Sequence, residues 1–111
     1  MSTSVRVKSN ICAKTSKITV SMTPEGEFDV QIKSDCDNIK NFAQGLEKLS
    51  MEDLIDKPNS KVINRYCGIS MSTNCLVPAG LLTAAWIEAG LISRSRAKAV
   101  QQSVVEYLID E

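Results

Sequence analysis

A long apolar segment bounded by a proline and a glycine constrains the fold of this chain most. From Pro78 to Ala89 the strongly polar side chains are Thr83 and Glu88 alone, and Gly90 follows. Proline fits the first turn of a helix, and glycine commonly supplies the left-handed residue that ends one. The segment therefore predicts a helix that is apolar nearly all round and covered on most sides. At about 1.5 Å per residue it is roughly 18 Å long, far short of the ~20 apolar residues that span a bilayer.

Length and charge limit the class of protein. The chain has 111 residues, 43% of them hydrophobic, which fits a single domain over residues 1–111. Thirteen basic side chains balance thirteen acidic ones without a long run of either sign, so we expect no nucleic-acid partner and no membrane partner. The first residues lack the apolar core of a signal peptide, which favours a cytoplasmic location.

The first third of the chain alternates apolar and polar residues, as half-buried strands do. This pattern holds over Ser4–Lys8, Ser16–Thr23 and Phe28–Lys33. Because Pro24-Glu25-Gly26-Glu27 reads as a turn, Ser16–Lys33 is expected to form a hairpin with one apolar face. A sheet with one apolar face needs helices to cover that face.

Helical spacing dominates the middle of the chain. Apolar residues three and four apart predict a helix over Asp37–Leu49, which Gly45 weakens. Ser50 and Asp53 resemble a capping box at the start of a short helix. Ser60 and Ser93 have the position of caps for two further short helices.

The chain ends in a segment with two interpretations. In Ser103–Ile109, a helix would use Val104 and Leu108, whereas a strand would use Val105, Tyr107 and Ile109. We prefer the strand because β-branched and aromatic residues are concentrated there. The complete pattern predicts an α+β fold of two layers, in which a small, mainly antiparallel sheet, joined by this last strand, carries helices packed on one face.

Four cysteines are the candidate site residues, and the chain contains no histidine. The lack of histidine excludes Ser–His and Cys–His catalysis and any zinc site that combines cysteine with histidine. Four thiolates can hold a Zn²⁺ ion or an iron–sulfur cluster, so we predict metal ligands at Cys12, Cys36, Cys67 and Cys75. A paired Cys-x-x-Cys knuckle is absent, so the fold would have to assemble the site. The alternatives are cysteines that pack as small apolar side chains, or a reactive thiol.

Local electrostatics distinguish the cysteines. Cys75 precedes the predicted core helix, whose positive N-terminal end favours a thiolate, so it is the best candidate for ligation or reactivity. At Cys36 the flanking Asp35 and Asp37 oppose that effect. Cys67 falls at a helix C-terminus, where the dipole disfavours a thiolate.

Glu88 is a carboxylate on an otherwise apolar helix. It must reach solvent, pair with a cation such as Arg94 or Arg96, or act as a ligand or acid. An anion site at Ser93–Arg96 is a further possibility, although a solvated face is the simpler interpretation.

Three short motifs stand in order along the chain: Ile11–Cys12, Ser34–Cys36, and Cys75–Pro78 with its continuation to Glu88-Ala89-Gly90-Leu91. With these motifs the chain resembles a family of small uncharacterised archaeal and bacterial proteins, which carry Ile-Cys-Gly, Ser-x-Cys, and Cys-x-x-Pro before a core helix that closes on Glu-x-Gly-Leu. The chain has Ala13 where that family often has glycine, and it lacks a histidine that many members place before the third cysteine. The resemblance implies cysteine chemistry, with metal binding as one form of it, and no established activity.

Three functions remain open. The first is a metal-binding module without catalysis, in which Cys12, Cys36 and Cys75 bind zinc or an iron–sulfur cluster and Cys67 is a fourth ligand. The second is a thiol or redox enzyme with Cys75 as the reactive thiolate. The third is an interaction domain, with a protein partner or as a homo-oligomer, whose cysteines only pack.

Overall fold

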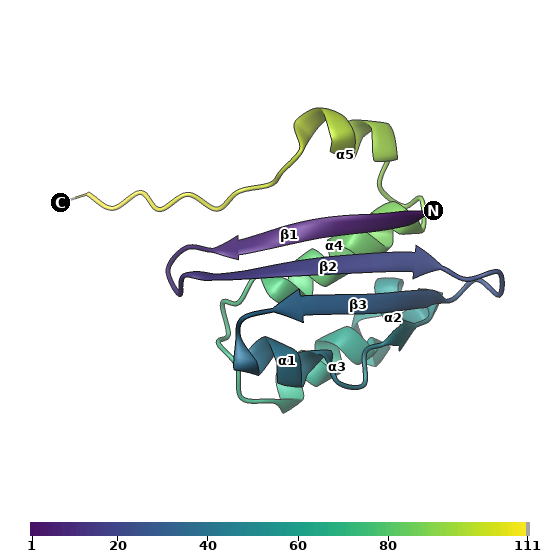
Figure 1. Cartoon of the computed structure of the whole chain (residues 1–111), viewed down its shortest axis with the longest axis horizontal. Coiled ribbons are helices and arrows are strands. Elements are labelled where there is room, and N and C mark those ends of the chain that lie inside the picture. The colour runs from purple at the N-terminus through teal and green to yellow at the C-terminus, as the bar shows by residue number, and fades with distance from the viewer. Residues whose placement is uncertain (111) are drawn as a thin grey trace.

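The computed structural model describes residues 1–110, and in these residues the chain has an α+β fold with one antiparallel sheet. The strands follow one another in space as they do in sequence, and all neighbours are antiparallel (Figure 1): β1 (Ser2–Ser9), β2 (Lys14–Met22), β3 (Phe28–Ser34) and β4 (Lys48–Leu49). The helices are α1 (Asp37–Ala43), α2 (Met51–Ile55), α3 (Lys61–Gly68), α4 (Val77–Glu88) and α5 (Arg94–Val100), with a 3₁₀ turn η1 (Lys57–Asn59) between α2 and α3. The predicted fold class and the hairpin are confirmed.

Helix α4 is the core helix that the sequence predicts. It starts at Val77, with Pro78 in the first turn, and Gly90 follows its end with φ 81°. Leu81, Ala84 and Ala85 are fully buried. Gly80 allows close approach to the sheet, since a Cβ at this position would lie 2.5 Å from Cγ2 of Val7. A side chain at this position would therefore require Val7 or α4 to shift.

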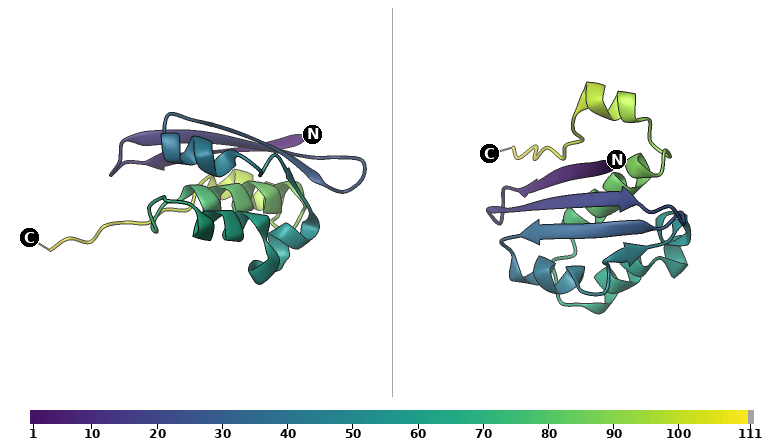
Figure 2. Two further views of the ribbon diagram at one scale, coloured as in Figure 1. Left: turned by 90° about the horizontal axis from the view of Figure 1, so that it is seen from below. Right: turned by 45° about the vertical axis from the view of Figure 1, so that its right-hand side comes forward.

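The other sides of α4 are covered by short helices. Figure 2 shows α2, α3 and α4 on the same side of the sheet. The half-buried Trp86 on α4 donates its indole N–H to the carbonyl of Leu54 on α2, at 2.9 Å. This bond ties α2 to the core helix. Within residues 1–110, no helix has the combination of length and apolar character that a membrane span requires.

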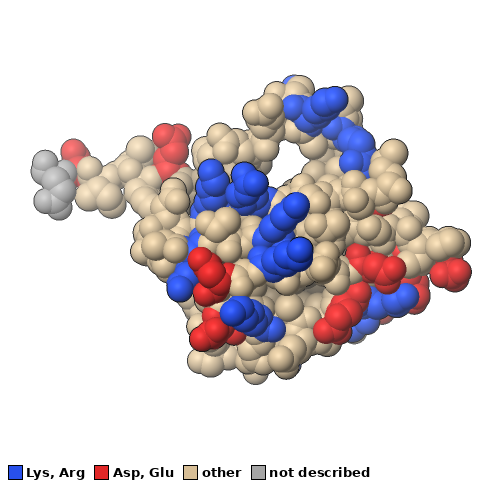
Figure 3. Space-filling view, in the orientation of Figure 1, with Lys and Arg blue, Asp and Glu red and all other residues tan. Residues whose placement is uncertain are grey.

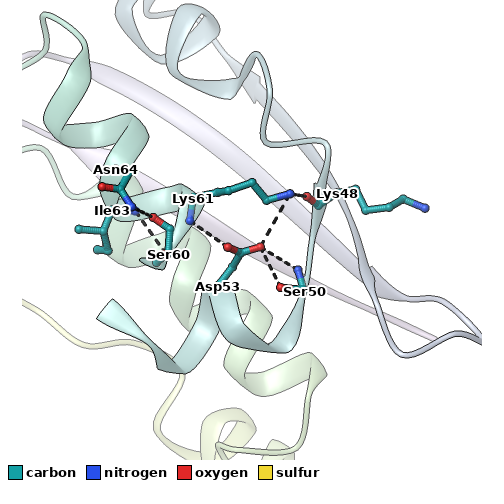
Figure 4. Close-up of polar contacts among 7 residues, drawn as sticks. All are labelled: Lys48, Ser50, Asp53, Ser60, Lys61, Ile63 and Asn64. Atoms are coloured by element: carbon teal, nitrogen blue, oxygen red, sulfur yellow. Dashed lines mark hydrogen bonds and ion pairs between the residues drawn. The ribbon is translucent and has the colours of Figure 1, made fainter. Parts of the chain in front are cut away.

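A buried carboxylate organises the connection between α2 and α3 (Figure 4). Asp53 is 3% exposed and accepts hydrogen bonds from the Ser50 N–H at 2.9 Å, the Ser50 hydroxyl at 3.2 Å and the Lys61 N–H at 2.9 Å. The predicted capping box is thus confirmed. The same carboxylate also accepts a hydrogen bond from the first residue of α3, Lys61. Ser60 caps α3 by accepting from the N–H of Ile63, which is the role that the sequence predicts.

The predicted helix over Asp37–Leu49 is wrong in its second half. Helix α1 ends at Ala43, and Gly45 has φ 89°, a left-handed conformation that stops the helix. The following residues then turn back to the sheet, where Leu49 pairs with Phe28 as part of β4. Leu49 is still fully buried. The apolar spacing therefore identified buried residues correctly but assigned them to one element instead of two.

The predicted C-terminal strand is also not formed. Residues 101–110 have no regular structure, and all of them are exposed. After α5 the backbone turns at Gln101, which has φ 69°, and the chain then runs away from the body of the domain (Figure 1). Within the described residues this segment pairs with no strand, although the outer edge of β1 is unpaired.

Candidate functional site

The four cysteines, all within the described residues 1–110, are free thiols. Cys12 lies in the turn between β1 and β2, and its thiol donates to the Ser9 carbonyl at 3.7 Å. Cys36 is the N-cap residue of α1, Cys67 lies in the last turn of α3, and Cys75 precedes α4 by two residues. Cys12 and Cys67 are exposed, whereas Cys36 and Cys75 are half-buried against the core.

Three of the cysteine positions belong to the same end of the sheet. The β1–β2 turn is at this end, and the pairing of Ser16 with Ser34 brings the end of β3 beside it. Helix α4 also starts here, because its other end contacts the start of β1 (Figure 1). Cys12, Cys36 and Cys75 are therefore neighbours in the topology, as a site assembled by the fold requires.

This shared location does not amount to a metal centre. Among residues 1–110, no three cysteine or carboxylate side chains lie close enough together to hold a metal ion. The predicted ligands Cys12, Cys36, Cys67 and Cys75 do not fit a zinc or iron–sulfur site in this arrangement. Metal binding by these residues stays a prediction.

Glu88 has a structural role. Its carboxylate is 5% exposed and accepts from the Thr3 hydroxyl at 2.8 Å, from the Met22 N–H at 2.9 Å and from the Arg94 guanidinium at 3.1 Å. Burial alone would raise the pKa of Glu88, but these three donors outweigh it, and the pKa of the carboxyl is lowered. The predicted pairing with Arg94 is confirmed, and the carboxylate joins α4 and α5 to the start of the sheet.

The other polar candidates are also engaged in local structure. Arg94 turns towards Thr3 and Glu88, and Ser93 caps α5 by accepting from the Arg96 N–H at 3.2 Å. Asp35 accepts from the Thr15 N–H at 3.2 Å, so it links β2 to the segment after β3. The predicted cap at Ser93 is therefore confirmed.

A different feature appears on the face of the sheet that the helices leave open. Strand pairing places Arg6 directly opposite Lys17, and Lys17 directly opposite Lys33. All three side chains are exposed. We call these three residues the basic row. Like charges directly opposite each other on neighbouring strands destabilise a sheet, so the basic row is kept at a cost in stability.

The ion pairs of the structure leave the basic row uncompensated. Within residues 1–110, the salt bridges are Lys40–Asp37, Lys48–Asp29, Lys61–Asp53 and Arg94–Glu88. Asp29 is on the open face, but it pairs with Lys48 at 3.2 Å. The hydrogen bond to Asp29 and the negative charge of that carboxylate raise the pKa of Lys48. Asp29 is thus already engaged, at the end of β3 opposite Lys33.

The basic row borders a shallow depression of about 50 Å³, lined by Lys17, Thr19, Gln31 and Lys33. Pockets for drug-sized ligands measure about 300–1,000 Å³, so a depression of this size suits a small polar group such as a carboxylate. Figure 3 views this face and shows Lys and Arg atoms gathered over one half of the sheet, with Asp and Glu atoms at its borders. Two cations and two hydrogen-bonding side chains therefore face the same small space.

Sequence reasoning missed the basic row because charge was judged along the chain. Arg6, Lys17 and Lys33 are far apart in sequence, and acidic residues elsewhere cancel them in the total. The signal was present in the strand alternation, since each of these residues falls on the polar face of its predicted strand. Combining that alternation with the register of the hairpin would have placed Lys17 beside Lys33.

A second hollow, of about 320 Å³, lies along α3 and is lined by Gly45, Leu46, Lys61, Asn64, Arg65, Gly68 and Ile69. Its lining combines two cations with an amide and apolar groups. Lysine can act as a base or nucleophile, but Lys61 donates to the Lys48 carbonyl at 2.9 Å and lies 3.8 Å from the Asp53 carboxylate. The one candidate base or nucleophile of this lining is thus already engaged in local structure.

Comparison with known proteins gives a family. No curated protein and no solved structure matches the chain. A family model described as a family of unknown function (DUF6951) matches residues 3–100. This match includes the sheet and all of the helices named above, and it ends where α5 ends. The chain therefore belongs to the family of unknown function DUF6951.

Proposed function

We propose that the chain is a protein-interaction module without catalysis of its own, and that its open sheet face binds an acidic segment of a partner protein. The observation that carries this proposal is the basic row of Arg6, Lys17 and Lys33, which is exposed and has no ion-pair partner in residues 1–110. Locally unfavourable arrangements are typical of functional sites, and a partner of opposite charge would compensate this one. A reducing, cytoplasmic location, which the free thiols favour, is part of the proposal.

The chemistry of the face favours a carboxylate partner. Next to the cations, Thr19 and Gln31 can donate hydrogen bonds to carboxylate oxygens in the depression. The strand positions on this face carry Ser, Thr, Gln, Asp, Lys and Arg side chains. Recognition of single-stranded nucleic acid uses aromatic side chains on which the bases stack. The open face lacks such a platform among residues 2–34, so we favour an acidic protein segment.

Binding of a synthetic oligo-glutamate peptide tests the proposal. We expect binding that weakens as salt is added, because exposed charges are screened. The double charge reversal Lys17→Glu with Lys33→Glu should weaken binding about tenfold or more, equivalent to at least about 1.4 kcal/mol. Isothermal titration calorimetry measures both effects.

The matched control is the double reversal Lys57→Glu with Lys98→Glu. These lysines are exposed on η1 and α5, away from the open face, and the net charge changes by the same amount. Equal weakening by both pairs would show that only net charge matters and would overturn the proposal. Tighter binding of a single-stranded oligonucleotide than of the peptide would replace the protein partner with a nucleic acid.

A cysteine metal module is the second candidate function. The observation in its favour is that the segments carrying Cys12, Cys36 and Cys75 share one end of the sheet. Binding of zinc or an iron–sulfur cluster would require the β1–β2 turn and residues 69–76 to move towards each other, with Cys67 as a fourth ligand.

Metal analysis of protein purified without a chelating tag tests this second candidate. The metal hypothesis predicts near one equivalent of zinc or iron per chain, and thiols that react with a labelling reagent only after a chelator is added. Metal-free folded protein in which Cys12 and Cys75 label at once would contradict it. The two candidates are measured separately, because the charge-reversal variants leave all four cysteines unchanged.

A further inference from the structure

The C-terminal segment combines exposure with strand-forming composition. Residues 103–110 include five large apolar side chains that are 61–89% exposed: Val104, Val105, Tyr107, Leu108 and Ile109. Contiguous apolar side chains of this kind are normally covered by a partner. β-branched and aromatic residues favour strands, and this segment is rich in both. We call residues 103–110 the tail.

The sheet offers a free edge of matching length. Strand β1 pairs with β2 along all eight residues from Ser2 to Ser9, without a bulge, and no strand in residues 1–110 pairs with its other side. An unpaired edge presents a row of backbone N–H and C=O groups that can receive another strand. The tail also has eight residues, so at about 3.3 Å per residue both segments span roughly 26 Å.

The tail does not reach this edge in its own chain. Arg94 holds the start of α5 against Thr3 at the beginning of β1, through a hydrogen bond of 2.8 Å. After α5 the tail runs in the same direction as β1, apart from it and exposed throughout (Figure 1). A second copy related by a twofold axis can present its tail in the antiparallel direction, which is the pairing used throughout this sheet.

We propose that the protein forms a homodimer by exchange of its tails, in which each tail adds as an antiparallel strand to the free edge of β1 in the second copy. The register follows from the side chains. With Glu106 opposite Arg6, Val105 stands opposite Val7 and Tyr107 stands opposite Val5. Val7 and Val5 are on the covered face of the sheet, so Val105 and Tyr107 extend the apolar core.

The same register compensates part of the basic row. Glu106 then lies on the open face beside Arg6, where the single chain has like charges opposite each other. Cross-strand pairs of opposite charge stabilise a sheet. The proposal rests on the free edge and the exposed tail, and it does not depend on the acidic partner proposed above.

Sedimentation velocity of the full chain and of a chain truncated after Gln102 tests the exchange. We expect a dimer for the full chain and a monomer for the truncated chain, with unchanged circular dichroism of the domain. A full chain that is monomeric at every concentration, or a truncated chain that remains dimeric, overturns the proposal. If the full chain is a monomer and its tail amides are protected from hydrogen exchange, the tail pairs with β1 of the same chain. This result also overturns the proposed dimer.

Charge exchange tests the register. Glu106→Arg and Arg6→Glu should each shift the dimer towards monomer, since each places like charges opposite each other, and the two changes together should restore the dimer. The matched control combines Glu106→Arg with Lys98→Glu, which restores the net charge at a site on α5. The proposed register is overturned if the control pair restores the dimer. It is also overturned if Glu106→Arg combined with Arg6→Glu does not restore the dimer. Because Glu106→Arg alone leaves the basic row unchanged, peptide binding to the open face is measured separately in that variant.

Discussion

Glu88 shows how one side chain joins elements that are distant in sequence. Its carboxylate accepts from a hydroxyl on β1, a backbone N–H at the end of β2 and a guanidinium on α5. Each bond to an ionised group contributes about 1.5–3 kcal/mol, and an unpaired buried donor costs a similar amount. The apolar helix therefore carries one acidic residue because three separate donors require it.

Replacing the charge at this position gives a prediction that depends on pH. Glu88→Gln should lower the free energy of unfolding by about 1–3 kcal/mol at neutral pH, because the amide cannot accept from all three donors as an anion does. The folded pKa lies below the ordinary value of 4.5, so this stabilisation is fully present above that value and is lost as the pH falls through the folded pKa. Urea denaturation across this range measures it. A difference between the two proteins that stays constant in acid would contradict the assignment.

Ala13 affects the stability of the fold through its backbone conformation. It has φ 55° in the turn before β2, a left-handed conformation that costs a residue with a Cβ roughly 1–2 kcal/mol. Ala13→Gly removes this strain but adds freedom to the unfolded chain, which costs about 0.4–1 kcal/mol. We expect a net stabilisation of about 0.5–1 kcal/mol in denaturant melts. Ala79→Gly on α4 is the control, and it should destabilise by about 1 kcal/mol.

At the scale of elements, contact between α4 and the sheet depends on a missing side chain. Gly80→Ala would place a Cβ 2.5 Å from Cγ2 of Val7, and overpacking of this kind costs about 1–3 kcal/mol. The control is Gly68→Ala at the end of α3, where a Cβ meets nothing within 4 Å, so that variant should be neutral or slightly more stable. Thermal melts of the two variants distinguish close packing from a general effect of alanine in helices. Equal melting temperatures would show that α4 does not sit as close to β1.

Elements whose signals are local were predictable from the sequence. Pro78 and Gly90 bound the core helix, and Ser50 with Asp53 marks the start of α2, because caps act on neighbouring backbone groups. The division of Asp37–Leu49 into α1 and β4 was not predictable in this way. It depends on Gly45 and on pairing with β3, and the latter is a contact between residues far apart in sequence.

At the scale of the whole molecule, charge is balanced in total and uneven in distribution. The two faces of the sheet differ in charge because the strand register places Arg6, Lys17 and Lys33 side by side on one of them. The order of residues alone does not reveal this register. For the same reason the relative positions of the cysteines were only partly predictable. The element ends were placed correctly, but whether Cys12, Cys36 and Cys75 meet depends on loop conformations that spacing does not determine.

The uneven distribution leads to a trade-off between stability and binding. Lys17→Glu replaces two repulsive cross-strand pairs with attractive ones, so it should raise the free energy of unfolding by about 0.2–1 kcal/mol while it weakens peptide binding. Added salt should stabilise the native protein and narrow this difference, because it screens the repulsion. Urea melts at low and high salt measure both effects. A Lys17→Glu variant that is less stable than the native protein would mean that the basic row carries no cost.

The bond between Trp86 and Leu54 has an optical consequence. The chain holds one tryptophan, so fluorescence excited at wavelengths that tyrosine does not absorb comes from a single place, the seam where α2 docks on α4. Emission therefore reports whether that seam is closed, whereas far-ultraviolet circular dichroism averages over the sheet and all the helices. A melt in which the emission shifts to longer wavelength before the dichroism changes would identify α2 as the part of the molecule that opens first.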